Sequence, residues 1–405
     1  MPLPPGLEAR LWEIRRGLAA PPHTVRVDRR LRTSYADIES REVVLAERQL
    51  GWLDWIYRHE LKHLKDLPRT VARDLYWQAK VMNRAPGHYR DLFRRFRRDV
   101  MNMAYDAVVD WELRSAPGVR KCVAEYVREL PEDVRRDPPP CDAARLMIAG
   151  LATYPWLLGK LERRDVVALA LDALEWLDRN RRTPQGPDGP SRLGEPTPED
   201  FEEAAADLIV EGEDLEGLDE IAREEGVRYD EERAALKALV RSYDWYLSAL
   251  RHREVHRGSR SRQDVWSPGD DPSRLDVNGS LAAFPRVIPG LTAVKREARP
   301  LGGHEEPLGF RDVAILADES YSMSGDKARA ARAVGVSLLG YLNRRRVQYQ
   351  VVGFGRTASV RVPLGFDYVR GVRYFTRTYS AWQGDTQLAP ALELLRGRDL
   401  LVYVI

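Results

Sequence analysis

The pattern of apolar residues changes near residue 311, and this change restricts the possible folds more than any other feature of the sequence. Beyond it, short apolar runs alternate with stretches of helical periodicity: the runs cover 313–317, 347–354, 358–364 and 400–405, and the helical stretches cover 326–344 and 387–396. Strands that alternate with helices in this way are typical of a parallel, doubly wound sheet. We therefore expect an α/β domain at residues 310–405.

The chain before this point has helical periodicity instead. Apolar residues recur at three- and four-residue steps, with breaks at prolines and glycines, over residues 8–20, 41–65, 70–83, 88–114, 142–180 and 234–250. A stretch rich in glycine and proline at 183–198 is typical of a linker. We expect four parts: a mostly helical region at 1–182, a linker and acidic helical segment at 183–256, an extended connector at 257–309, and the α/β domain at 310–405.

Charge is balanced overall but unevenly distributed. The formal net charge is +2, which excludes a generally basic nucleic-acid coat protein, yet residues 199–232 hold sixteen acidic residues and two arginines. Six arginines fall between Arg84 and Arg98. A basic run of this kind can bind phosphate or nucleic acid, but the acidic segment offers a counter-charge within the chain. We therefore expect the acidic segment to lie against the arginine-rich helices, and we do not expect nucleic-acid binding.

Cysteine content and hydropathy bear on the cellular location. The chain has only Cys122 and Cys141, too few for a disulfide scaffold. No apolar run approaches the length of about 18 residues that a membrane span needs. These features predict a cytoplasmic protein without a membrane span.

The first strand of the α/β region runs directly into an Asp-x-Ser-x-Ser motif. Asp318, Ser320 and Ser322 occupy alternate positions of the loop, and Thr386 lies in a second loop just before a helix. Ligands of open α/β sheets collect at the carboxyl ends of strands, and hard oxygen donors suit Mg²⁺ or Mn²⁺. The alternative is an ordinary loop that caps a helix, since serine and aspartate favour helix starts.

These residues resemble a known family. Residues 310–405 resemble the first half of a von Willebrand factor A domain, and Asp318, Ser320, Ser322 and Thr386 match its metal-ion-dependent adhesion site (MIDAS). The resemblance implies a bound cation with one open position, which an acidic side chain of a partner protein fills. Residues 266–270 and 288–297 resemble segments that precede the A domain in prokaryotic proteins. Several of those proteins work beside MoxR-type AAA+ ATPases, which makes such an ATPase the expected partner.

The same resemblance raises an expectation about the end of the chain. The family has one further metal-loop aspartate after the fourth strand, whereas this sequence stops at Ile405. We therefore expect a truncated A domain that holds Mg²⁺ only weakly. Its last strand, at 400–405, would be an outer strand, and an apolar edge of this kind is a pairing liability. A partner chain or the N-terminal helices should cover it.

The helical half contains a His-Glu-x-x-His motif at residues 59–63. The i,i+4 spacing puts His59 and His63 on one face of a helix, where they can bind one Zn²⁺ while Glu60 activates a water molecule. Lys62 departs from the usual zinc-peptidase pattern, which has an uncharged residue there. The alternative is a solvated helix face with ordinary charged residues.

A third ligand must come from another segment. Asn102, Asp106 and Asp110 form a polar stripe on an otherwise apolar helix, and buried charges must be paired or bound to metal. Salt bridges to the arginines just upstream are the alternative. Residues 45–115 resemble the metallopeptidase half of prokaryotic proteins that end in an A domain. That resemblance implies Asp106 as the third ligand, with Asp110 or Asn102 orienting a ligand histidine.

Three functions follow as hypotheses. The first is a cytoplasmic adaptor that binds a partner protein through the cation site of Asp318, Ser320, Ser322 and Thr386. The second is an active zinc hydrolase with a zincin-like helical half. The third is a structural helper of an AAA+ machine, in which both metal sites are degenerate. A phosphate-binding loop is absent from the sequence, so any ATPase activity would belong to a partner.

Overall fold

The computed structural model describes residues 6–180, 194–242, 312–381 and 384–405, together with three two-residue strands. The chain divides into two compact units, Met1–Ile209 with Glu213–Ala235 and Val210–Gly212 with Leu236–Ile405. The expected linker and the expected connector lie mostly outside the described residues. Within the connector, strands β4 (Asp264–Val265), β5 (Leu275–Asp276) and β6 (Val294–Lys295) pair antiparallel in the order β4-β6-β5.

The first unit is mostly helical. Its helices are α1 (Leu7–Leu18), α2 (Leu53–Lys65), α3 (Val71–Arg84), α4 (Gly87–Leu113), α5 (Val119–Glu129), α6 (Glu132–Arg136), α7 (Pro140–Ala149), α8 (Pro155–Glu162), α9 (Val166–Asn180), α10 (Pro198–Val210) and α11 (Glu216–Glu224), with a 3-10 helix η1 (Glu47–Trp52) before α2. The predicted helices at 8–20, 70–83 and 88–114 are confirmed. Residues 142–180 contain α8, α9 and all but the first two residues of α7. Among the described residues, no helix has the length and apolar character needed to cross a bilayer.

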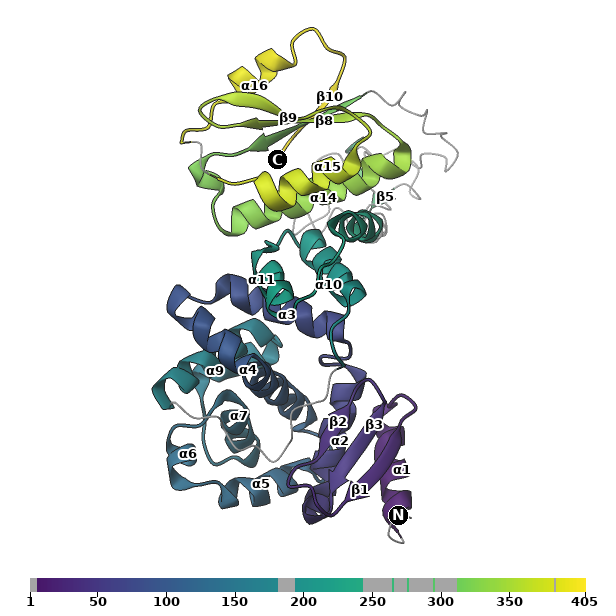
Figure 1. Cartoon of the computed structure of the whole chain (residues 1–405), viewed down its shortest axis with the longest axis vertical. Helices are drawn as coiled ribbons and strands as arrows, with labels where there is room; N and C mark the ends of the chain where they lie inside the picture. Colours follow the sequence, from purple (N-terminus) through teal and green to yellow (C-terminus); the bar gives the residue numbers. More distant parts are fainter. Residues whose placement is uncertain are drawn as a thin grey trace. The chain divides into compact units, whose positions relative to one another are not determined.

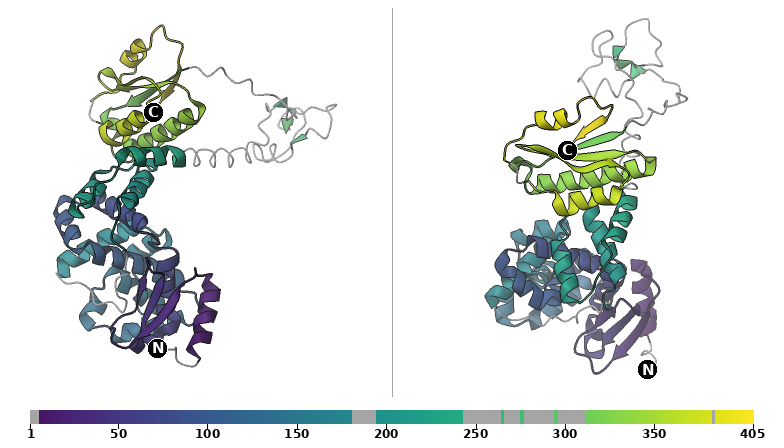
Figure 2. Two further views of the ribbon diagram at one scale, coloured as in Figure 1. Left: turned by 45° about the vertical axis from the view of Figure 1, so that its right-hand side comes forward. Right: turned by 45° about the horizontal axis from the view of Figure 1, so that its top comes forward.

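Residues 24–46 contain a small sheet that was not predicted. The sequence analysis predicted a helix from residue 41 and no element for residues 24–37. The sheet contains β1 (Thr24–Asp28), β2 (Tyr35–Asp37) and β3 (Glu42–Ala46) in the order β1-β3-β2, with β3 parallel to β1 and antiparallel to β2. The predicted helix at 41–65 is therefore wrong over its first residues. Residues 43–46 are buried without a break, as expected for a central strand rather than one face of a helix. Figure 2 shows this sheet beside α1, close to the N-terminus.

Helix α2 contacts several other elements of the first unit. It packs against α1, β2, α4 and α5. Its apolar residues join a core with side chains of α4 and α5: Trp55, Ile56, Leu61, Leu64, Val109, Leu113 and Val123. Every residue from Trp55 to Leu64 except Lys62 is buried. The polar side chains of α2 are therefore inside the unit, where each needs a partner.

The acidic segment packs against the arginine-rich helices, as the charge pattern predicted. Helix α11 lies along α3. Four of the six arginines form ion pairs with it or with the residues just before and after it: Arg84 with Glu213, Arg90 with Glu216, Arg94 with Glu220 and Glu224, and Arg97 with Glu224 and Glu225. The sequence grouped residues 183–256 as one region, whereas residues 213–235 belong to the first unit.

The second unit contains a mixed sheet with helices on both faces. Its elements are β7 (Val313–Asp318), the 3-10 helix η3 (Tyr321–Met323), α14 (Asp326–Arg345), β8 (Tyr349–Phe354), β9 (Ala358–Gly365), α15 (Tyr368–Arg373), the π-helix η4 (Tyr374–Thr378), α16 (Ala389–Leu394) and β10 (Leu401–Val404). Helices α14 and α15 cover one face, and α16 covers the other (Figure 1). A further helix runs over residues 231–242, so the described part of the predicted helix at 234–250 is confirmed.

The strand order is β10-β7-β8-β9, with the first strand of the unit inside the sheet. The second and third strands lie on one side of the first, and β10 lies on the other side as an outer strand, as expected. The expectation of a fully parallel sheet is wrong for β9, which is antiparallel to β8. Only residues 355–357 separate these strands, and so short a connection cannot make the crossover that parallel strands need.

Strand β10 is an edge of this sheet. It pairs with β7 on one side, and its side chains from Leu401 to Val404 are 38–58% exposed. The exposed apolar edge that the sequence led us to expect is therefore present. Its cover by another chain stays a prediction.

Candidate metal centre

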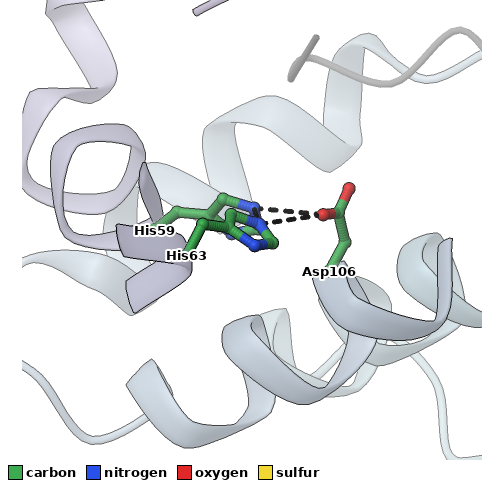
Figure 3. A group of neighbouring side chains, drawn as sticks. All are labelled: His59, His63 and Asp106. Carbon is green, nitrogen blue, oxygen red and sulfur yellow. Dashed lines mark hydrogen bonds and ion pairs between the residues drawn. The ribbon is translucent and has the colours of Figure 1, made fainter. Parts of the chain in front are cut away.

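Helices α2 and α4 bring three potential metal ligands together. His59 and His63 lie one turn apart on α2, and Asp106 faces them from α4 (Figure 3). The Nε2 atoms of the two histidines are 3.0 Å apart. The Oδ1 atom of Asp106 lies 3.3 Å from Nε2 of His59 and 3.2 Å from Nε2 of His63. All three side chains are buried.

The other ring nitrogens fix the histidine tautomers. Nδ1 of His59 lies 2.8 Å from a carboxylate oxygen of Asp110, and Nδ1 of His63 lies 2.7 Å from the carbonyl oxygen of Leu67. These oxygens accept hydrogen bonds, so each Nδ1 carries the proton and donates it. In a neutral imidazole Nε2 then holds a lone pair. Two lone pairs and a carboxylate oxygen thus converge, which is repulsive unless a proton or a metal cation lies between them.

The distances suit a tetrahedral zinc ion. Zinc binds imidazole nitrogen and carboxylate oxygen at about 2.0–2.2 Å, so two ligands of a tetrahedral site lie roughly 3.3 Å apart. The three observed separations, 3.0, 3.2 and 3.3 Å, are close to that value. Three protein ligands leave the fourth position for water or substrate, as in catalytic zinc sites.

A second layer of side chains, buried or partly buried, holds His59 and Asp106 in place. Asp110 accepts hydrogen bonds from Trp55 (2.6 Å) and from Arg145 (2.7 Å) in addition to the one from His59. Asn102 donates to the Oδ2 atom of Asp106 at 3.2 Å. Of the two residues expected to orient a histidine, Asp110 therefore contacts one and Asn102 instead contacts the carboxylate.

The charges of this cluster do not balance. Arg145 on α7 pairs with Asp110 and Asp142 and lies 3.6 Å from Asp106, and all four side chains are buried. Three carboxylates thus surround a single guanidinium, and a divalent cation would supply the two missing positive charges. Burial raises the pKa of Asp142 despite Arg145. Burial also acts on Asp110, but Arg145 and His59 outweigh it and lower the pKa of Asp110.

Glu60 and Lys62, which lie between the two histidines of the motif, face different surroundings. Glu60 is 1% exposed and follows His59 directly on α2. Lys62 is less buried and forms ion pairs with Asp66 and Glu112. The unusual lysine thus has its own acidic partners, which explains how the motif tolerates a charge at this position.

The sequence analysis did not identify Arg145, Asp142 or Trp55 as members of this cluster. A signal was present: Asp142 and Arg145 stand three residues apart in the otherwise apolar helix α7. Such a pair inside an apolar helix indicates a buried polar network.

The second candidate site lies at the carboxyl end of β7. The hydroxyl of Ser320 lies 2.9 Å from that of Ser322 and accepts a hydrogen bond from Thr386 at 2.8 Å. The carboxylate of Asp318 accepts a hydrogen bond from the backbone of Ser320 at 2.8 Å. The four residues of the motif therefore meet, and their side chains offer one carboxylate and three hydroxyl groups.

Glu319 lies between these residues in sequence but is turned into the core. Its carboxylate pairs with Arg361 of β9 at 2.6 Å and accepts a hydrogen bond from Tyr374 at 2.8 Å. The Tyr379 hydroxyl donates to the carbonyl of Asp318 at 2.7 Å. Burial and the neighbouring Glu319 raise the pKa of Tyr374. These contacts fix the backbone from which Asp318 and Ser320 project.

The two sites differ in the metals they suit. The first offers two imidazoles and a carboxylate, a set typical of zinc, and the second offers oxygen donors alone, a set typical of magnesium or manganese.

Comparisons of the chain with family models, curated proteins and solved structures found no match.

Proposed function

We propose that the first unit is a zinc-dependent hydrolase of the metallopeptidase type, with a zincin-like arrangement. One observation carries the proposal: two imidazole nitrogens and a carboxylate oxygen converge within 3.0–3.3 Å while the opposite ring nitrogens are held as donors. The resemblance of residues 45–115 to metallopeptidase halves supports the same assignment. His59, His63 and Asp106 are the proposed ligands.

The chain's own residues would divide the work as follows. His59, His63 and Asp106 would hold the zinc ion, which when bound would activate a water molecule for hydrolysis near neutral pH. Glu60 is the proposed general base that accepts this proton and delivers it to the leaving group. Asp110 and the Leu67 carbonyl hold the two imidazoles in the ligating tautomer. Arg145 holds Asp110 in turn.

Three variants test this function. Purified wild-type protein should contain one zinc ion per chain, and His59→Ala should lose it. Glu60→Gln should keep the zinc but lower the hydrolysis of an unstructured protein substrate by about 10²–10⁴-fold, the usual contribution of a general base. Lys62→Gln, in the same motif but paired with Asp66 and Glu112, should change neither zinc content nor rate. Wild-type protein that folds without metal and shows no thermal shift with zinc would refute the proposal.

We propose a second function for the second unit, as an A-type domain that binds a partner protein through a divalent cation. Its support is the meeting of Ser320, Ser322 and Thr386 beside Asp318 at the end of a central strand. Mg²⁺ or Mn²⁺ would bind these oxygens, and an acidic side chain of the partner would complete the site. The resemblance to A-domain proteins favours a MoxR-type AAA+ ATPase as that partner.

Calorimetry with Mg²⁺ and Mn²⁺ tests the second function. We expect weak binding of Mg²⁺, with a dissociation constant above about 1 µM, since few charged oxygens surround the site. Ser320→Ala should weaken Mn²⁺ binding by about tenfold or more, equivalent to about 1.4 kcal/mol. Ser324→Ala, an exposed serine of the same turn, serves as the control and should bind like the wild type. Equal binding by wild type and Ser320→Ala would place the cation elsewhere.

If neither unit binds metal, the remaining hypothesis is a structural helper with degenerate sites.

A further inference from the structure

A cavity of about 540 Å³ adjoins the metal centre in the first unit. Helices α3 and α4, residues 31–35 and residues 194–196 contribute to its wall. Two lining residues connect it to the metal centre. Asn102 donates a hydrogen bond to Asp106, and Pro68 follows Leu67, whose carbonyl holds His63. The volume lies within the range of about 300–1,000 Å³ that small-molecule sites occupy.

The wall of this cavity contains a buried carboxylate that lacks a cationic partner. Asp74 of α3 is 8% exposed. Its carboxylate accepts hydrogen bonds from the Tyr105 hydroxyl at 2.7 Å and from the Gln78 amide. Both donors are neutral, and Asp74 forms no ion pair with any residue that the structure describes. The charges of Arg97 and Arg98 act on Asp74 without forming an ion pair with it. A buried carboxylate without a directly bonded cation is costly, and a cationic ligand would compensate it.

A second acceptor stands beside this carboxylate. The side-chain amide oxygen of Gln78 (Oε1) is buried and has no hydrogen-bond partner within the described ranges. Gln78 lines the same cavity. An unsatisfied buried acceptor costs free energy that a donor on a ligand recovers. Asp74 and Gln78 together therefore favour a ligand with several donors and a positive charge.

The remaining charged groups of the wall lie nearer solvent. Arg97 is ion-paired with Glu224 and Glu225, and Arg98 is exposed. Apolar side chains, among them Leu75 and Met101, line other parts of the cavity. A long side chain with an apolar stem and a cationic tip fits this combination, because the stem packs on apolar surface while the tip reaches the acceptors.

We propose that this cavity binds the basic side chain of an arginine or lysine residue, and that Asp74 determines this preference. The role of the cavity as the substrate-selecting pocket rests on the proposed hydrolase function. The binding itself does not, because it needs only the cavity, Asp74 and Gln78. The hydrolase would then act on peptides next to a basic residue.

Binding of three small probes tests the proposal. Calorimetry on the zinc-loaded full chain would use Nα-acetyl-L-arginine amide, its neutral analogue Nα-acetyl-L-citrulline amide, and the anionic Nα-acetyl-L-glutamate amide. We expect the arginine probe to bind best. Asp74→Asn should weaken its binding by about tenfold or more, equivalent to about 1.4 kcal/mol, and should leave the citrulline probe unaffected. Preferred binding of the glutamate probe, or of none, would overturn the proposal.

The variants are chosen so that folding does not decide the result. Burial raises the pKa of Asp74 to about 6, although the hydrogen bonds from Tyr105 and Gln78 and the charges of Arg97 and Arg98 act against it. Burial thus already disfavours the charged form of Asp74, and a neutral amide at this position avoids that cost. Gln78→Met removes the second acceptor at similar size and should also weaken arginine binding. Asp172→Asn is the matched control, a partly buried aspartate of α9 that pairs with Lys160 and does not line the cavity. It should bind the probe like the wild type.

The outcomes separate this proposal from the hydrolase function. Arginine binding that depends on Asp74 in a protein that retains no zinc would support the pocket and refute the hydrolase. Hydrolysis by the zinc-loaded protein without preference for basic residues, and with Asp74→Asn unchanged, would refute the pocket and leave the hydrolase intact.

Discussion

Replacing Arg145 with methionine should lower the free energy of unfolding by about 3–5 kcal/mol, the usual cost of breaking a buried charge pair. Arg145 is fully buried and is the cation that pairs with Asp110 and Asp142. Methionine fills similar space but leaves these carboxylates uncompensated. Urea unfolding, followed by the fluorescence of the buried tryptophans, measures the change. Zinc affinity should fall as well, because Asp110 loses the group that holds it against His59.

Asp142→Asn provides the control for this prediction. It removes a carboxylate whose pKa burial already raises, so alone it should cost less than about 1.5 kcal/mol, the usual net value of a hydrogen bond. The double variant Arg145→Met with Asp142→Asn should recover part of the stability lost by Arg145→Met. If the single variant Arg145→Met unfolds at the same urea concentration as the wild type, the uncompensated carboxylates do not destabilise the fold and the prediction is wrong.

Zinc should stabilise the first unit strongly. A ligand that binds only the folded state at a thousand times its dissociation constant adds about 4 kcal/mol to the free energy of unfolding. For a unit of this size that gain corresponds to a rise of roughly 10 °C in the midpoint of thermal unfolding. Scans with zinc and with a chelator measure the difference. The ligand side chains are buried and their convergence is repulsive without a cation, so the effect should be large.

His63→Ala isolates the contribution of the site. It removes one ligand, so its midpoint should differ little between zinc and chelator. Magnesium should not replace zinc in the wild type, since imidazole ligands suit zinc and not magnesium. An equal zinc-dependent shift in His63→Ala would mean that zinc binds elsewhere on the chain.

The convergence of His59, His63 and Asp106 could be predicted in part because its spacing is local. His59 and His63 are one helical turn apart, and Asp106 lies on a polar stripe of one helix, from which the resemblance to metallopeptidase halves singled it out. Such patterns survive in the folded chain whenever the helices form. Arg145 and Asp142 were not predicted, because their role depends on how α7 approaches α2 and α4, which no local pattern encodes.

The fold was predictable to a similar extent. The alternation of strands and helices after residue 311 indicated the second unit, and the resemblance to an A domain implied that its last strand is an outer strand. The N-terminal sheet was missed because β1 and β2 are short and weakly buried and the apolar run of β3 fits a helix equally well. The contact between the acidic segment and the arginines could be predicted from charge alone. Two oppositely charged segments attract each other whichever individual residues form the ion pairs.

The buried side chain of Glu319 ties the loop after β7 to other elements of the second unit. Asp318 and Ser320 project toward the candidate cation site, whereas the residue between them is tied to β9 and to the π-helix through Arg361 and Tyr374. A shift of the backbone at Asp318 and Ser320 would therefore strain the contacts of Glu319 with Arg361 and Tyr374. These contacts reach β9, which is the edge strand of the sheet opposite β10.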